Sequence, residues 1–314
     1  MQRLISDAHG VLSLEDAAPV SELVEATFRQ RVAAYVALTK PRIIELLLVT
    51  TVPAMILAAG GWPSTWLVLA TLVGGTLSAG GANAINCYLD RDIDAVMPRT
   101  KRRPLPMHRI EPRNALAFGV VLGTIALVFL WTLVNPTAAV VSTAALLFYV
   151  LVYTWGMKRT TPQNIVIGGA AGAMPVLVGW AAVTGTIGLP ALAMFGIVFY
   201  WTPPHFWALA MRYEKEYAAA GVPMMPVVYG KEETTKHILL YSFMQLALCL
   251  ALFSVARMGM LYLVAALVLN AVFIGGAIKL YRAPSAKRAW ELFRFSIYFL
   301  ALLFTAIALD VLLF

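Results

Sequence analysis

The sequence NALAFGVVLGTIALVFLWTLV, residues 114–134, contains no charged side chain. About 20 mostly apolar residues are enough for one helix to cross a lipid bilayer. Eight other ranges have a similar length and composition: 43–60, 66–88, 138–156, 164–184, 188–211, 237–256, 259–280 and 293–313. Together these ranges predict an all-α, polytopic membrane protein with nine transmembrane helices.

The composition of the whole chain also favours a membrane protein. Of its 314 residues, 61% are hydrophobic and 13% are charged, whereas a soluble domain carries about 25% charged residues. The net charge of +8 is compatible with a nucleic-acid partner. However, the basic residues lie in short loops between apolar runs, as they do in membrane proteins. We therefore expect the lipid bilayer as a partner and no nucleic acid. The two cysteines, far apart in sequence, suggest neither a disulfide framework nor a CxxC metal site.

The positions of the basic residues predict the orientation. If the N-terminus is cytosolic, 23 of the 24 Lys and Arg residues fall on the cytosolic side and only Arg257 lies opposite. Cytoplasmic loops show this excess of positive charge. We expect the bacterial cytoplasmic (inner) membrane, with the C-terminus on the opposite side. Residues 1–40 lack the pattern of a signal peptide. They are expected to form a cytosolic tail with an amphipathic stretch near 20–38, ahead of a membrane domain at 41–314.

An acidic stripe is predicted where the second span reaches the cytosol. Asn86, Asp90 and Asp94 are four residues apart, so on a helix each is rotated by about 40° from the last. Asp92 falls on the opposite side. Carboxylates that face one another repel unless a cation lies between them. Their oxygen atoms suit Mg²⁺, which binds carboxylates together with substrate phosphates. The spacing therefore predicts a Mg²⁺ site.

Basic side chains follow this stripe and return in the next cytosolic turn. Guanidinium groups bind phosphate oxygens in pairs, and Lys contributes a point charge. An acidic stripe beside such cations suits a metal-bound diphosphate, although the basic residues could instead be topology anchors. The candidate diphosphate-binding residues here are Arg99, Lys101, Arg102, Arg103, Lys158 and Arg159.

The pattern Asn86-x-x-x-Asp90-x-x-x-Asp94 resembles the first motif of the UbiA superfamily of intramembrane prenyltransferases. Three blocks resemble its protoheme IX farnesyltransferase (haem O synthase) branch more narrowly. They are residues 90–105 (DRDIDAVMPRTKRRPL), 153–175 (YTWGMKRTTPQNIVIGGAAGAMP) and 201–213 (WTPPHFWALAMRY). The resemblance covers about residues 35–310.

The resemblance implies transfer of the farnesyl group of farnesyl diphosphate to a vinyl group of haem b. Water adds in the same reaction, which gives haem O and diphosphate; haem b is then a substrate and Mg²⁺ the cofactor. The implied fold is nine helices around a central cavity. One departure concerns the place of the second acidic motif, which here reads RYEKEY at 212–217. Glu216 is therefore expected to ligate or orient one ion, and Tyr213 and Lys215 to contact the diphosphate.

A prenyl carbocation and its apolar tail require a dry channel with aromatic walls, since cations are attracted to aromatic faces. Tyr88, Tyr153, Trp155 and Trp207 are candidates for these walls, and packing at the lipid interface is an alternative for each. His205 lies within a predicted span, where an ionisable side chain is costly and usually functional. A hydrogen bond to a carbonyl freed by the preceding prolines is its alternative. The expected haem contacts are His205, His108, Trp207 and Tyr153.

Two other functions stay open. The chain could be a prenyltransferase that acts on an aromatic or quinone-precursor acceptor, or a transporter or assembly factor without catalysis. Transporter sites usually lie near the membrane midplane, whereas these acids lie at the predicted cytosolic edge. A homo-oligomer, or contact with haem-supplying or oxidase-assembly proteins, is also open.

Overall fold

The computed structural model describes residues 27–314, except for the side chains of residues 42–48. Every regular element in this part of the chain is helical. The elements are α1 (Phe28–Leu38), α2 (Pro41–Ala59), α3 (Thr65–Leu89), α4 (Arg91–Val96), α5 (Pro112–Leu133), α6 (Pro136–Leu147), the π-helix η2 (Phe148–Met157), α7 (Asn164–Thr184), α8 (Leu189–Arg212), α9 (Glu214–Ala219), α10 (Met225–Val228), α11 (Gly230–Val255), α12 (Met260–Arg282) and α13 (Ala286–Leu313).

Each of the nine predicted spans coincides with one long helical element, once α6 and η2 are taken together. Seven of these elements, all except α2 and α8, are long and apolar enough to cross a membrane. In α2 the apolar helix that can be described is Val49–Ala59. In α8 the sequence from Thr202 to His205 lowers the mean hydropathy. The membrane character and the all-α class are confirmed, and the count of nine spans stays a prediction.

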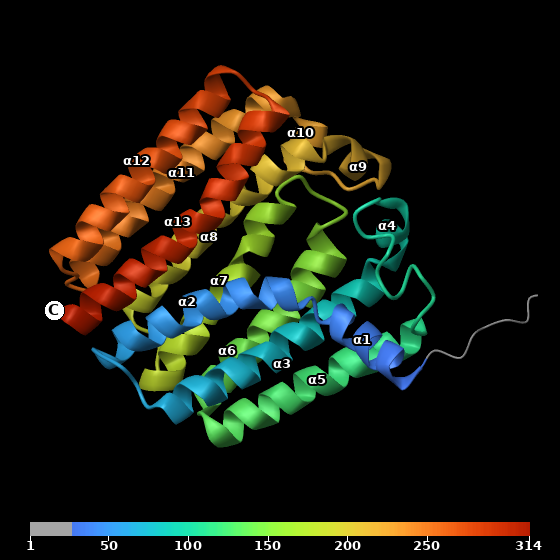
Figure 1. Cartoon of the computed structure of the whole chain (residues 1–314), viewed down its shortest axis with the longest axis horizontal. Coiled ribbons are helices and arrows are strands. Elements are labelled where there is room, and N and C mark those ends of the chain that lie inside the picture. The colour runs from blue at the N-terminus through green and yellow to red at the C-terminus, as the bar shows by residue number, and fades with distance from the viewer. Residues whose placement is uncertain (1–26) are drawn as a thin grey trace, which may run out of the picture.

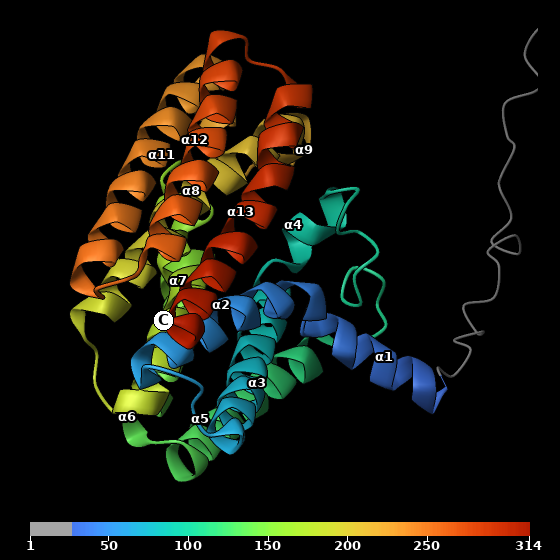
Figure 2. The same ribbon diagram turned by 60° about the vertical axis from the view of Figure 1, so that its left-hand side comes forward.

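The long helices pack side by side, and the two long polar connections lie at the same end of the bundle (Figures 1 and 2). These connections are residues 87–113, which include α4, and residues 212–236, which include α9 and α10. The C-terminus lies toward the opposite end (Figure 1). α1 projects from the bundle beside α3 (Figure 2). It covers residues 28–38 of the predicted amphipathic stretch, and residues 1–26 lie outside the described part.

Small residues let the helices approach closely. A Cβ atom added to Gly81 of α3 would lie 2.7 Å from the carbonyl oxygen of Gly119 on α5. Glycine contacts of this kind bring the backbones of neighbouring membrane helices together. The close contact holds α5 against the half of α3 that leads into the acidic stripe.

At the other end of the bundle, the buried carboxylate of Asp310 joins the end of α13 to the start of α12. Asp310 of α13 is 4% exposed. It accepts hydrogen bonds from the backbone N–H groups of Gly259 (2.6 Å) and Tyr262 (3.0 Å) at the start of α12. The first N–H groups of a helix have no partner within the helix, and they attract negative charge. Asp310 therefore caps α12 from a distant part of the chain.

The π-helix η2 alters the side-chain directions at the end of its span. The Lys158 N–H donates to the Tyr153 carbonyl (2.8 Å), five residues back. The Thr154 hydroxyl likewise donates to the Tyr149 carbonyl (2.8 Å). Thr154 is buried at 1% exposure, whereas its neighbour Trp155 is 73% exposed. Segments of π-helix occur frequently at functional sites, and this one places Thr154 against the acidic stripe.

Candidate active site

The acidic stripe lies where α3 ends. α3 ends at Leu89 and α4 begins at Arg91, so Asp90 joins the two helices. Backbone hydrogen bonds continue across this junction, from Asp90 to Asn86 (2.9 Å) and from Asp94 to Asp90 (2.8 Å). The exposures of Asn86, Asp90 and Asp94 are 2%, 1% and 3%. The helical spacing therefore buries all three side chains, although the helix itself is interrupted.

Asp90 is the most enclosed of the three. Its Oδ2 atom accepts from Lys158 Nζ (2.5 Å) and from Asn86 Nδ2 (2.8 Å). Its Oδ1 atom is buried and has no hydrogen-bond partner among the described residues. A second cation, Arg159, lies near this carboxylate, with its Nη2 atom 3.8 Å from Oδ1. Asp90 thus keeps one carboxylate oxygen available inside a positively charged environment.

Lys40 contributes to the site from the N-terminal side of α2. Its Nζ atom donates to the Asn86 amide oxygen (2.6 Å), while Asn86 Nδ2 also donates to the Thr154 hydroxyl (3.0 Å). Burial lowers the pKa of Lys40. The local sequence gives no sign of this contact because it joins positions 46 residues apart. The Asn86 oxygen, expected to face the metal, here faces Lys40.

The other two acids have separate partners. Arg103 donates to both oxygens of Asp94, at 2.9 and 2.8 Å. Arg159 forms a forked pair with Asp92, at 2.6 and 2.7 Å. This hydrogen-bonded guanidinium lowers the pKa of Asp92 to about 2. The Asp92 side chain is 62% exposed, in agreement with its predicted separation from the stripe.

Arg99, in the connection 87–113, contacts two tyrosines in the connection 212–236. Its Nη2 atom donates to the Tyr217 hydroxyl (3.1 Å). Its guanidinium carbon lies 5.4 Å from the ring centroid of Tyr213 and 5.6 Å from that of Tyr217. Such cation–π contacts attract the two groups. The connections that follow the second and sixth predicted spans therefore contact each other through Arg99.

The remaining predicted residues of the connections are less enclosed. Lys101, Arg102 and Lys215 are exposed. Glu216 is half-buried, and its Oε2 atom is buried without a hydrogen-bond partner in the described part of the chain. Glu216 therefore offers a second available carboxylate oxygen, as its predicted role in orienting a cation requires.

The four expected haem contacts do not form one group. Tyr153 lies within electrostatic range of Asp90, Tyr217 and Arg99, and so belongs to the acidic site. Trp207 is fully buried and packs against Tyr241 of α11, with 5.2 Å between ring centroids. His108 is exposed in the first long connection.

His205 faces α13 instead. Its ring stacks between Trp201 and Phe293, with centroid distances of 4.3 and 4.5 Å. Its Nδ1 atom lies 2.6 Å from the Ser296 hydroxyl oxygen, and that hydroxyl donates to the Phe293 carbonyl (2.6 Å). A hydroxyl has one proton to donate, so Nδ1 must carry the proton of the imidazole. Nε2 is then the nitrogen with a free lone pair.

The donor atoms of the stripe fit a hard divalent cation such as Mg²⁺. Carboxylate and amide oxygens are its usual protein ligands, and two buried carboxylate oxygens lack partners, at Asp90 and Glu216. No group of three or more Asp, Glu, His or Cys side chains among the described residues is close enough to hold a metal by itself. The phosphate oxygens of a bound diphosphate would therefore have to complete the coordination.

The chain is similar to known proteins over most of its length. The model of the UbiA prenyltransferase family matches residues 47–303. The chain is 55% identical over 295 residues to the protoheme IX farnesyltransferase of Parafrankia sp. (strain EAN1pec), covering 92% of this chain and 93% of that protein. It is 56% identical over 281 residues to protoheme IX farnesyltransferase 1 of Saccharopolyspora erythraea, covering 88% and 89%.

Two solved structures share the fold. A digeranylgeranylglyceryl phosphate synthase has a TM-score of 0.76 and 18% identity, covering 90% of this chain and 98% of its own. A UbiA homologue from Archaeoglobus fulgidus, bound to DMAPP and Mg²⁺, has a TM-score of 0.63 and 18% identity, covering 87% and 99%. The family model spans most of the chain and the relatives are more than half identical to it, so this chain belongs to the UbiA prenyltransferase family.

Proposed function

We propose that this chain transfers the farnesyl group of farnesyl diphosphate to a vinyl group of haem b. Water adds in the same reaction, and the products are haem O and diphosphate. The relatives named above as protoheme IX farnesyltransferases support this acceptor and this donor. The observation that carries the proposal is the buried Asp90, which has one available oxygen and is surrounded by cations.

Asp90 and Glu216, each with an available oxygen, would hold Mg²⁺ together with the diphosphate. Asn86 and Asp94 would join them if the ion replaced Lys40 and Arg103 as the partner of their oxygens. A solved UbiA homologue contains both DMAPP and Mg²⁺, in line with this assignment. When bound, the ion would act as a Lewis acid that neutralises charge on the diphosphate as it departs. The chain's own residues supply the rest of the electrostatic field.

The cations around the stripe stabilise the leaving group. Negative charge grows on the diphosphate as the allylic carbon–oxygen bond breaks, and fixed positive groups in a water-poor site stabilise it strongly. Lys158 and Arg103 are placed by their ion pairs with Asp90 and Asp94. Lys40 is placed by Asn86. These three cations hydrogen-bond to the stripe directly, Arg159 lies 3.8 Å from Asp90, and Arg99 lies at the junction of the two connections.

Tyr153 bounds the same site. A Cβ atom added to Gly168 of α7 would overlap the Tyr153 ring, so this glycine is what admits the ring between α7 and η2. Its aromatic face would stabilise positive charge on the farnesyl carbon. The active site would open to the cytosol, with a cytosolic N-terminus, because the basic residues gather at this end.

The experiment is turnover by the purified protein supplied with haem b, farnesyl diphosphate and Mg²⁺, with haem O detected by chromatography. Wild-type protein and the control Glu232→Gln, an exposed acid on α11, should form haem O. Asp90→Asn should lose at least about a hundredfold in rate, about 2.7 kcal/mol of transition-state stabilisation. Wild-type protein that forms no haem O but prenylates an aromatic acid would overturn the acceptor and support the quinone-precursor alternative.

A further inference from the structure

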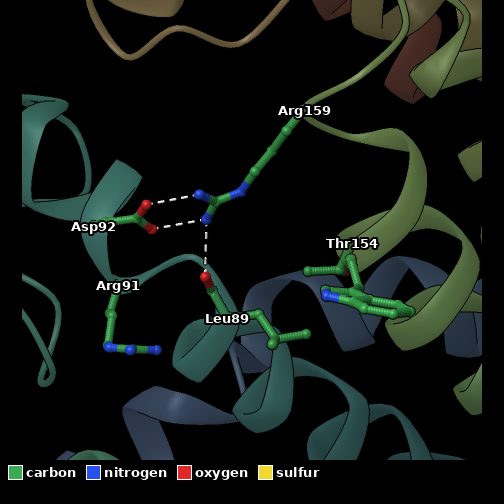
Figure 3. A pocket seen from close by; sticks show the side chains of 6 residues that line it. Leu89, Arg91, Asp92, Thr154 and Arg159 are labelled. Carbon is green, nitrogen blue, oxygen red and sulfur yellow. Dashed lines mark hydrogen bonds and ion pairs between the residues drawn. The ribbon is translucent and has the colours of Figure 1, made fainter.

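A recess lies directly beside the acidic stripe, on the side of η2 that carries the exposed Trp155. It has a volume of about 420 Å³ and is lined by Leu89, Arg91, Asp92, Thr154, Trp155 and Arg159. Figure 3 shows Arg159 reaching across it to Asp92 and to the Leu89 carbonyl. This volume lies within the range of about 300–1,000 Å³ that is typical of small-molecule sites. We call it the Trp155 pocket.

The charges that line the Trp155 pocket favour an anionic ligand. Arg159 is neutralised by its forked pair with Asp92. Arg91 donates to the Tyr88 carbonyl (2.7 Å), and its guanidinium lies 4.7 Å from the Tyr88 ring centroid. Among the described residues Arg91 forms no ion pair with a carboxylate. The pocket therefore carries one surplus positive charge on a side chain whose position is already fixed.

Trp155 gives the pocket a flat apolar surface. Its side chain is 73% exposed, and the π-helix η2 ends two residues later. Of the two positions that the sequence left open for Trp155, an interior wall and packing at the lipid interface, this exposure excludes the interior wall. A wide aromatic face beside a fixed guanidinium matches a planar, largely apolar molecule that carries a carboxylate.

The pocket and the acidic stripe share a wall. Thr154 lines the pocket and accepts from Asn86 Nδ2 (3.0 Å), and Asn86 in turn donates to Asp90 (2.8 Å). Arg159 also spans both, since it pairs with Asp92 and lies 3.8 Å from Asp90. Thr154 and Arg159 would thus contact both a ligand in the pocket and the residues of the acidic stripe.

We propose that the Trp155 pocket is the docking site of the porphyrin acceptor, with the macrocycle against Trp155 and a propionate carboxylate at Arg91. This inference rests on the proposed function, which supplies a flat dicarboxylate as the acceptor. Beyond that function, the pocket specifies the side from which the acceptor approaches the active site and the side chains that recognise it.

The test measures porphyrin binding separately from turnover. Mesohaem has the ring and both propionates but no vinyl group, so it can bind and cannot react. Protein in nanodiscs of neutral lipid would be added to mesohaem, and binding would be followed by the change in mesohaem absorbance. Trp155→Ala and Arg91→Gln should each weaken mesohaem binding about tenfold or more, equivalent to about 1.4 kcal/mol. In turnover assays of the same two variants, the KM for farnesyl diphosphate should stay within about twofold of the wild-type value.

Matched controls separate docking from general effects. Trp66→Ala removes another exposed tryptophan, at the far end of α3, and Arg282→Gln removes an exposed arginine at the end of α12; both should bind mesohaem like wild type. Mesohaem dimethyl ester lacks the carboxylates, so its binding should respond to Trp155→Ala and not to Arg91→Gln.

Three results would overturn the pocket assignment. The first is unchanged mesohaem binding in both variants. The second is an equal loss for mesohaem and farnesyl diphosphate. The third is an Arg91→Gln effect that appears only in anionic lipid, since the arginine then binds lipid phosphate. Wild-type protein that forms no haem O would instead refute the proposed function. Wild-type turnover with unaltered variants refutes the pocket alone.

Discussion

Replacing Lys158 with Met tests the ion pair at the centre of the site. The substitution removes the cation 2.5 Å from Asp90 Oδ2 and leaves a carboxylate that is 1% exposed. Removing one partner of a buried pair costs about 3–5 kcal/mol. Arg159, 3.8 Å from Asp90, could offset part of this loss by moving closer, and the full attraction of such a pair is about 4 kcal/mol at an effective dielectric constant of about 20. Because Arg159 is 38% exposed and already holds Asp92, solvent screens most of this attraction. We therefore expect a net loss of about 2–3 kcal/mol.

The assay is reversible unfolding by SDS in mixed micelles, followed by helical circular dichroism. The double variant Asp90→Asn/Lys158→Met removes both charges, so it should regain at least about half of the loss. Lys287→Met, an exposed lysine on α13, is the control and should match wild type. A Lys158→Met protein as stable as wild type, or a double variant no more stable than the single one, would refute the reasoning.

Three further perturbations test other parts of the structure. Gly81→Ala places a Cβ 2.7 Å from a backbone oxygen of α5 and should cost about 1–3 kcal/mol of unfolding free energy in SDS. Gly75→Ala, which meets nothing within 4 Å, should be neutral or stabilising by up to about 1 kcal/mol; equal losses at both sites would contradict the close contact. Asp310→Ala removes the cap of α12, should cost about 1–2 kcal/mol, and should speed amide hydrogen exchange in its first turn, whereas unchanged exchange would argue against capping. Arg159 lowers the folded-state pKa of Asp92 to about 2, so the contribution of this pair is full above the unfolded pKa of about 3.9 and is lost as the pH falls through about 2. The stability difference between wild type and Asp92→Asn should therefore be constant from about pH 8 to about pH 5, and a decline already within that range would contradict the assignment.

Much of the site follows from local sequence. The spacing of Asn86, Asp90 and Asp94 predicts one buried stripe, and the structure keeps it even though α3 is interrupted, because hydrogen bonds four residues apart continue across Asp90. The separation of Asp92 follows from the same periodicity. The sequence left two positions open for Trp155, an interior wall and packing at the lipid interface, because the π-helical geometry of its segment leaves no clear signal in the sequence.

By itself the sequence determined which segments are helices in a membrane, because a bilayer requires long apolar runs with internally satisfied backbone groups. It also determined where the acids and bases gather, since both follow directly from the ends of those runs. Only the tertiary structure decided which cation neutralises which acid. Lys158 pairs with Asp90 across 68 positions, and Lys40 reaches Asn86 across 46. Such contacts depend on how distant helices pack and on which side chains are desolvated together, and neither is encoded in the spacing of residues along one helix.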